Sequence, residues 1–243
     1  MSPGILTAPI LRKSRDYPFR DFPAFAKPII VRAIEAAWER IGEHSEQHGG
    51  SLLEEGEEVL TTRLEECLND IQSEPDHPSG FSASLFQAVV RDAAVTSYDD
   101  SSLKKRPDLT FRLVPVEPGL ERSSHYGLFV ECKIVGPRHP VQDYCDHGLL
   151  RFVSGEYAWA MPCGMMVGYA WEGFSISDTL NDHLRTGKSP GMSLLSMPRP
   201  VPAQPGSSPV FESGHGRAWV RDGKSHGDIV ILHLWLPLQR GRS

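Results

Sequence analysis

One largely apolar segment in the middle of the chain carries a carboxylate and an ammonium group. In the run from 126 to 135, Glu131 and Lys133 are two residues apart, so on a β-strand both side chains point to one side and Cys132 points to the other. Two charges in so apolar a run are costly unless they pair or bind something. This segment is the first candidate for a site with chemistry.

A second carboxylate precedes this segment. Asp108 begins another strand-like run 23 residues before Glu131, and it comes to lie beside Glu131 if the two runs pair as a hairpin. Two neighbouring carboxylates bind a hard cation such as Mg²⁺, and a lysine beside them can position or deprotonate water. The set predicts phosphodiester hydrolysis. An exposed Asp108 and a simple Glu131–Lys133 ion pair on a sheet edge are the alternative interpretation.

An acidic helix offers a third carboxylate. On a helical projection centred on Leu60, Glu57 falls at about 60° and Glu58 at about 160°. Four apolar side chains lie within about 40° of that leucine: Leu53, Leu64, Cys67 and Ile71. We therefore expect Glu57 at the margin of the buried stripe, where it meets either a metal or water. Glu58 is expected to face solvent.

A third grouping lies near the C-terminus. In Ser213-Gly214-His215-Gly216-Arg217, strand alternation sends Ser213, His215 and Arg217 to one face. This face could contact a backbone phosphate, and a polar glycine-rich turn is the alternative. A serine hydrolase built on Ser213, His215 and a distant acid such as Asp228 is disfavoured, because the sequence lacks a G-x-S-x-G elbow.

The elements that must position these residues follow from the hydrophobic period. Residues 1–27 contain four prolines and are expected to form an extended arm, followed by a single domain over 28–243. Helical spacing predicts helices from Pro28 to Ile41 and from Leu53 to about residue 72, and a weaker helix over 84–94.

The second half of the chain predicts strands and shorter helices. Runs 108–116 and 126–135 are expected to pair antiparallel, followed by a helix over 141–157, a strand over 165–171 and a helix over 177–186. Residues 189–210 hold six prolines and five serines, which favours a mobile loop. Strands are expected over 210–220 and 228–236. The order indicates a mixed α/β fold.

Charge and composition exclude several classes of protein. The chain has 243 residues and a formal charge of −6, of which residues 44–76 carry −9, so no whole-molecule positive field attracts polyanions. No apolar run is long enough to span a membrane and no signal peptide is recognisable, which predicts a cytoplasmic protein without membrane partners. Four cysteines without metal-ligand spacing are expected to be buried free thiols: Cys67, Cys132, Cys145 and Cys163.

Together these motifs resemble the PD-(D/E)XK nuclease superfamily, which has a restriction-endonuclease-like fold. The resemblance covers residues 50–171 and rests on Glu57-x-x-Leu60-Thr61, Pro107-Asp108, Glu131-x-Lys133 and the helix after the second strand. It implies an α/β fold with a mixed central β-sheet flanked by helices, in α-β-β-β-α-β order. It also implies cleavage of DNA, or less often RNA, supported by Mg²⁺ or Mn²⁺, for example in defence against foreign DNA or in repair.

The resemblance assigns roles to individual residues. Asp108 and Glu131 would be metal ligands, Lys133 would position water, Cys132 would contribute its main-chain carbonyl, and Glu57 would bind directly or through water. The helix over 141–157 would abut the active face, so that Arg151 and Tyr157 could hold a phosphate, with a solvated arginine and a packed tyrosine as the alternative. The long connection between the two strands departs from the family pattern.

A second hypothesis is that the protein has the same fold but catalyses no reaction. The chain would then be a catalytically silent module that binds nucleic acid or a partner protein, although the full set of acids and lysine is present. The negative charge predicts weak affinity for nucleic acid at physiological salt, hence help from a homodimer or a partner protein. No Walker loop or dinucleotide fingerprint is found, so the sequence does not indicate ATP or NAD dependence.

Overall fold

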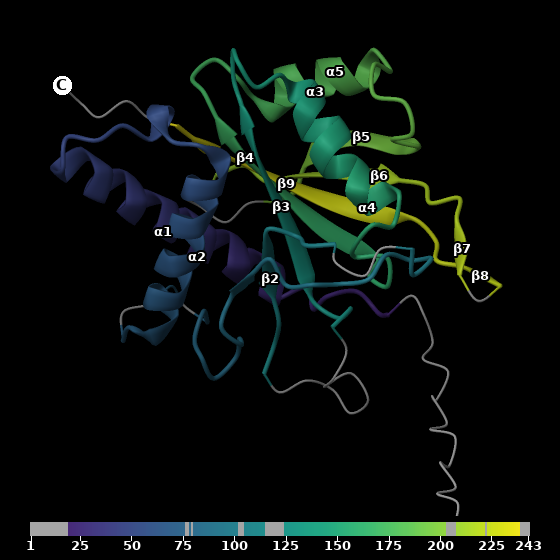
Figure 1. Ribbon diagram of the computed structural model, residues 1–243, viewed down its shortest axis with the longest axis horizontal. Helices are drawn as coiled ribbons and strands as arrows, with labels where there is room; N and C mark the ends of the chain where they lie inside the picture. Colours follow the sequence, from purple (N-terminus) through teal and green to yellow (C-terminus); the bar gives the residue numbers. More distant parts are fainter. Residues whose placement is uncertain are drawn as a thin grey trace, which may run out of the picture.

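A mixed β-sheet crosses the centre of the protein (Figure 1). The computed structural model describes residues 19–75, 78, 80–101, 105–114, 124–202, 208–221 and 223–238. Within them the sheet has seven strands in the order β1-β2-β3-β4-β9-β6-β5. β3, β4 and β9 run parallel, whereas the other neighbours are antiparallel. The predicted fold class, α/β with a mixed central sheet flanked by helices, is confirmed.

The strands differ widely in length. The central strands are the longest and the most buried. In chain order the seven strands of the sheet are β1 Val90–Arg91, β2 Leu109–Phe111, β3 Leu128–Val135, β4 Cys163–Ala170, β5 Leu194–Pro200, β6 Phe211–His215 and β9 Ile229–Pro237. A separate two-stranded sheet joins β7 Val220–Arg221 to β8 Lys224–Ser225.

Two long helices and several short ones flank the sheet. In chain order they are α1 Ala26–Gln47, the 3₁₀ helix η1 Leu52–Glu54, α2 Glu57–Ser73, α3 Val141–Tyr144, the π-helical η2 Cys145–Leu149, α4 Leu150–Val153, the π-helical η3 Ile176–Leu180 and α5 Asn181–Arg185. Pro28 falls in the first turn of α1, where a missing N–H is tolerated. No helix among the described residues combines the length and apolarity that a membrane crossing requires.

The helices lie on opposite faces of the sheet. On one face, the Trp38 ring of α1 stacks on Tyr169 of β4 at 4.9 Å, and Thr61 of α2 lies 3.1 Å from the Tyr169 hydroxyl. On the other face, Tyr144 of α3 lies 2.8 Å from Nδ1 of His233 in β9. Successive residues of a strand point to opposite faces, so each face of β3, β4 and β9 is covered by its own helices.

Two expected elements differ from the structure. Residues 84–94 do not form a helix: the main chain of Gln87 donates to the Arg112 carbonyl, and β1 extends the sheet beside β2. The expected loop over 189–210 contains β5, an edge strand, where Pro198 and Pro200 are tolerated because one side of the strand needs no donors. Sheet pairing thus overrides local composition in both segments.

The remaining differences concern element ends. The helix expected over 141–157 ends at Val153, and β2 ends at Phe111. Residues 1–18 of the expected N-terminal arm lie outside the described residues, whereas Phe19 and Phe22 are buried in the core beside Tyr126. The four cysteines are free thiols, of which Cys67 is only half-buried.

Candidate active site at the open edge of β3

The candidate site forms where β2 stops and β3 continues. β2 pairs with β3 only as far as Val130, and beyond it no strand of the described residues covers that edge of β3. The Cys132 N–H donates instead to Oδ2 of Asp108 at 2.7 Å, and the Ile134 N–H donates to Oε2 of Glu57 at 3.2 Å. Two carboxylates from distant segments are thereby held at the exposed edge.

Lys133 is the cation at the centre of this cluster. Its ammonium lies 2.6 Å from Oε1 of Glu57, 3.1 Å from Oε1 of Glu131 and 2.8 Å from the Cys132 carbonyl oxygen. Burial alone would lower the pKa of Lys133, but the carboxylates of Glu131 and Glu57 outweigh it and raise the pKa above its ordinary value. The amine is therefore protonated at neutral pH.

Glu131 is the buried carboxylate of the cluster. Its Oε1 also accepts from Arg151 at 2.8 Å, and its Oε2 accepts from the Tyr157 hydroxyl. Burial and the negative charge of Asp108 raise the pKa of Glu131 to about 7, although Lys133 and Arg151 oppose the shift. Burial also raises the pKa of Asp108, against the hydrogen bond from Cys132. These two carboxylates repel each other at a site where a further cation would be stabilised.

The oxygen atoms of the cluster are of the chemical type that binds a hard divalent cation. Asp108, Glu131 and the Cys132 carbonyl supply the oxygen ligands that Mg²⁺ prefers, and Mg²⁺ is commonly held by one or two carboxylates while it keeps several waters. No group of three or more His, Cys, Asp or Glu side chains within the described ranges is arranged to hold a metal. Glu57 accepts from the Lys133 ammonium and from the Ile134 N–H, and it thereby positions the lysine at the edge of β3.

The side of α2 that faces the cluster is the one carrying Glu57. The neighbouring Glu58 side chain is 84% exposed and pairs with Arg91 at 3.4 Å, away from Lys133. Thr61, one turn after Glu57, binds the Glu57 carbonyl and lies beside Tyr169. These contacts fix the first turn of α2 against the sheet.

The helix after β3 reaches over the cluster. A Cβ atom added at Gly148 would lie 2.5 Å from Cε of Met166 and 3.3 Å from Cγ of Lys133, so glycine permits this close approach. Gly148 belongs to the π-helical segment η2, a type of segment frequent at functional sites. One turn later Arg151 reaches Glu131.

Arg151 and Tyr157 meet the cluster in a different role from the expected one. Tyr157 is buried and its hydroxyl is bound to Glu131, so it is not placed to hold a phosphate. Arg151 pairs with Glu131 while its side chain is 37% exposed, so part of that side chain remains open to solvent. Both residues hold the carboxylate of Glu131 in place.

The structure does not bring Ser213, His215 and Arg217 to this site. All three are buried, and the Arg217 guanidinium donates to main-chain carbonyls, including those of Gly227 at 3.0 Å and His226 at 3.0 Å. Ser213 and His215 do share a face, but it is the buried face of β6. Strand alternation in the sequence groups residues on one face and does not tell whether that face points to the core or to solvent. The phosphate-binding interpretation of these residues is therefore wrong.

Ser213 and His215 belong to a buried chain of hydrogen bonds. His215 Nδ1 lies 2.7 Å from the Met192 carbonyl, which only accepts, so Nδ1 carries the proton and Nε2 accepts from Ser213 at 2.8 Å. Ser213 then accepts from Nε2 of His233 at 2.7 Å, and Nδ1 of His233 accepts from Tyr144 at 2.8 Å. This network of hydrogen bonds is closed off from solvent, so Ser213 is not an accessible nucleophile.

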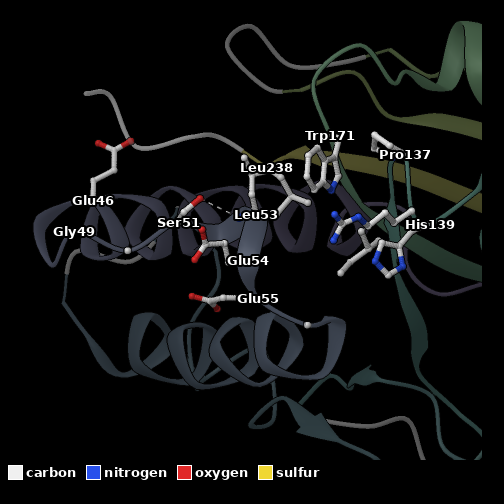
Figure 2. A pocket seen from close by; sticks show the side chains of 14 residues that line it. Glu46, Gly49, Ser51, Leu53, Glu54, Glu55, Pro137, His139, Trp171 and Leu238 are labelled. Carbon is white, nitrogen blue, oxygen red and sulfur yellow. Dashed lines mark hydrogen bonds between the residues drawn. The ribbon is translucent and has the colours of Figure 1, made fainter.

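A large pocket adjoins the candidate site and was not expected from the sequence. Its volume is about 1150 Å³, and it lies between the end of α1, η1 and the segments that follow β3 and β4 (Figure 2). Trp171 and Arg138 line it, each shortly after the end of a parallel strand. Ligands often bind outside the carboxyl ends of parallel strands, so their positions after two apolar runs were the available signal.

No family model, curated protein or solved structure matches the chain. The functional interpretation therefore depends on the geometry of the cluster itself.

Proposed function

We propose that this protein is a divalent-metal-dependent nuclease that hydrolyses the phosphodiester bonds of DNA. The observation that carries the proposal is the convergence of Asp108, Glu131, Lys133 and the Cys132 carbonyl at the open edge of β3. The order α2, β1-β2-β3, α3 to α4, β4 agrees with the α-β-β-β-α-β order of PD-(D/E)XK nucleases. The order and the cluster support the same interpretation independently.

Each residue of the cluster has a physical role in this proposal. A divalent cation held by Asp108 and Glu131 would supply a Lewis acid and lower the pKa of water. Lys133 keeps a positive charge where negative charge develops on the phosphate, and it can hold the attacking water. Arg151 and Tyr157 fix the Glu131 carboxylate. Glu57 fixes the Lys133 ammonium.

The net charge bears on the partners of this nuclease. At −6 the chain as a whole repels a polyanion, so affinity for nucleic acid has to come from local cations such as the open part of Arg151. We propose that a second copy or a partner protein adds affinity and specificity, and that the enzyme acts in the cytoplasm.

One observation favours the silent module as a second candidate. Every carboxylate oxygen of Glu131 and Glu57 already has a donor within the chain: Lys133, Arg151, Tyr157 or the Ile134 N–H. A site neutralised in this way is stable without a metal. A binding module would use the same fold without turnover.

A cleavage panel tests the proposal. Purified protein is incubated with plasmid, linear duplex, single-stranded DNA and RNA, in Mg²⁺, Mn²⁺ or excess EDTA. We expect cleavage of at least one DNA substrate with Mg²⁺ or Mn²⁺ and none with EDTA. Activity that persists in EDTA would contradict the metal-dependent mechanism. Binding without cleavage of any substrate, with either metal, would favour the silent module.

A further inference from the structure

The pocket beside the cluster is continuous with the candidate active site. Ile134, whose N–H binds Glu57, lines the pocket, as does Gly56, which immediately precedes Glu57. The pocket therefore begins where the cluster ends, along the same open edge of β3. A substrate strand whose phosphate lies at Lys133 would have a neighbouring nucleotide at this opening.

Trp171 forms a fixed wall of this pocket. Its main-chain N–H donates to the Val135 carbonyl at 2.9 Å, which continues the pairing of β4 with β3. A Cβ atom added at Gly136 would lie 2.3 Å from Cδ1 of Trp171, so the indole lies directly on the bare backbone of that glycine. Since the ring is only partly buried, it offers a rigid surface for stacking.

Arg138 lies at the tip of a tight turn next to Trp171. Gly136 and His139 exchange two main-chain hydrogen bonds, at 2.9 and 3.1 Å, around Pro137 and Arg138. Arg138 is exposed, and none of the ion pairs among the described residues includes it. The turn thus presents a cation at the rim of the pocket.

The opposite wall of the pocket is acidic. Figure 2 shows Glu46, Glu54 and Glu55 across from Trp171, Pro137 and His139. Oε1 of Glu55 pairs with Arg63 at 2.7 Å, whereas its Oε2 is buried without a hydrogen-bond partner among the described residues. A carboxylate wall repels phosphate and accepts hydrogen bonds from amino groups.

We propose that this pocket binds one unpaired nucleotide of the substrate strand, next to the phosphate that is cleaved. The base of this nucleotide stacks on Trp171, and the exocyclic amino group of the base donates to Glu54 or Glu55. The phosphate of the nucleotide contacts Arg138. Adenine, cytosine and guanine carry such an amino group, whereas thymine does not. The inference rests on the proposed nuclease function and specifies its substrate as a strand with an unpaired base.

Fluorescence of 2-aminopurine tests the pocket directly. A single-stranded oligonucleotide carrying this base at successive positions is titrated with protein in Ca²⁺, which we expect to bind without efficient turnover. Stacking on the indole should quench the fluorescence at one position. Trp171→Leu should abolish the quenching and weaken binding roughly 10-fold or more, as losing a stacked base typically does, while Trp171→Phe should keep most of both.

Matched variants distinguish a loss of binding in the pocket from a general effect on folding. Phe25→Leu removes an exposed aromatic that does not line the pocket and should leave quenching unchanged. Arg138→Ala alters only an exposed side chain, so the fold should persist. It should weaken binding and lower the slope of log affinity against log salt by about one.

The outcomes distinguish this inference from the proposed function. If the wild type cleaves DNA, no position is quenched and Trp171→Leu is as active as the wild type, then nucleotide binding in the pocket would be refuted while the nuclease proposal would stand. Quenching that depends on Trp171, without cleavage of any substrate, would support nucleotide binding in the pocket and refute the nuclease proposal. Equal affinity for thymine and for the three amino-bearing bases at the quenched position would overturn the role of Glu54 and Glu55.

Discussion

The buried chain from Tyr144 to the Met192 carbonyl predicts a specific loss of stability in acid. Burial, and secondarily the neighbouring His215, lower the pKa of His233 to about 3, far below the 6.5 of an unfolded histidine. Between these values the unfolded state binds a proton that the folded state does not. The contribution of the neutral His233 to stability is therefore fully present above pH 6.5 and is lost as the pH falls toward 3.

The size of this loss follows from the pKa difference. Each pH unit well inside the window changes the free energy of unfolding by about 1.4 kcal/mol, so His233 alone removes roughly 2–3 kcal/mol by pH 4.5. Glu131 acts with the opposite sign, because its folded pKa of about 7 exceeds the ordinary 4.5. Comparing two proteins that both contain Glu131 cancels that contribution.

His233→Gln is the informative variant. A glutamine can accept from Tyr144 and donate to Ser213, as the assigned tautomer of His233 does, but it does not titrate. Urea unfolding at several pH values should show the stability difference between wild type and variant changing by about 1.4 kcal/mol per pH unit below 6.5. The exposed His147→Gln should show no such trend. A difference for His233→Gln that stays constant from pH 7 to 4.5 would refute the reasoning.

Three further predictions concern single side chains. Glu57→Gln should lower cleavage roughly 10-fold or more because Lys133 loses the nearer of its two carboxylate partners, whereas Glu58→Gln should leave the rate unchanged; equal rates for the two variants in a cleavage time course would contradict this. Gly148→Ala should lower stability by about 1–3 kcal/mol and slow cleavage, because the new Cβ displaces Met166 and Lys133; a variant with wild-type urea midpoint and rate would contradict it. Arg217→Lys should cost about 3 kcal/mol or more by leaving buried carbonyls unpaired, and thermal unfolding with an unchanged midpoint would show that these contacts contribute little.

The hydrophobic period was sufficient for the parts of the fold that bury one face. It predicted α1, α2, β3, β4 and β9, and the helical projection separated Glu57 from Glu58. The hydrophobic period failed for residues 84–94 and 189–210, where pairing with a distant strand determines the secondary structure. Edge strands take their hydrogen bonds from a neighbour that the local sequence does not reveal.

The candidate site shows the same division. Alternation placed Glu131 and Lys133 on one side of a strand, and pairing brought Asp108 beside them. Alternation also grouped Ser213 with His215, but the depth of β6 in the sheet made that face internal. The contacts of Tyr157 with Glu131 and of Trp171 with Gly136 join segments that are distant in the sequence, so local patterns do not predict these contacts.

The most direct test of the nuclease proposal compares wild type with Lys133→Ala in single-turnover cleavage, with binding measured separately in Ca²⁺. Lys133 carries the charge at the point where Glu57, Glu131 and the Cys132 carbonyl converge. We predict that Lys133→Ala binds DNA within a few-fold of the wild type and cleaves it roughly 10²-fold or more slowly in Mg²⁺. Equal cleavage rates for the two proteins would contradict the account.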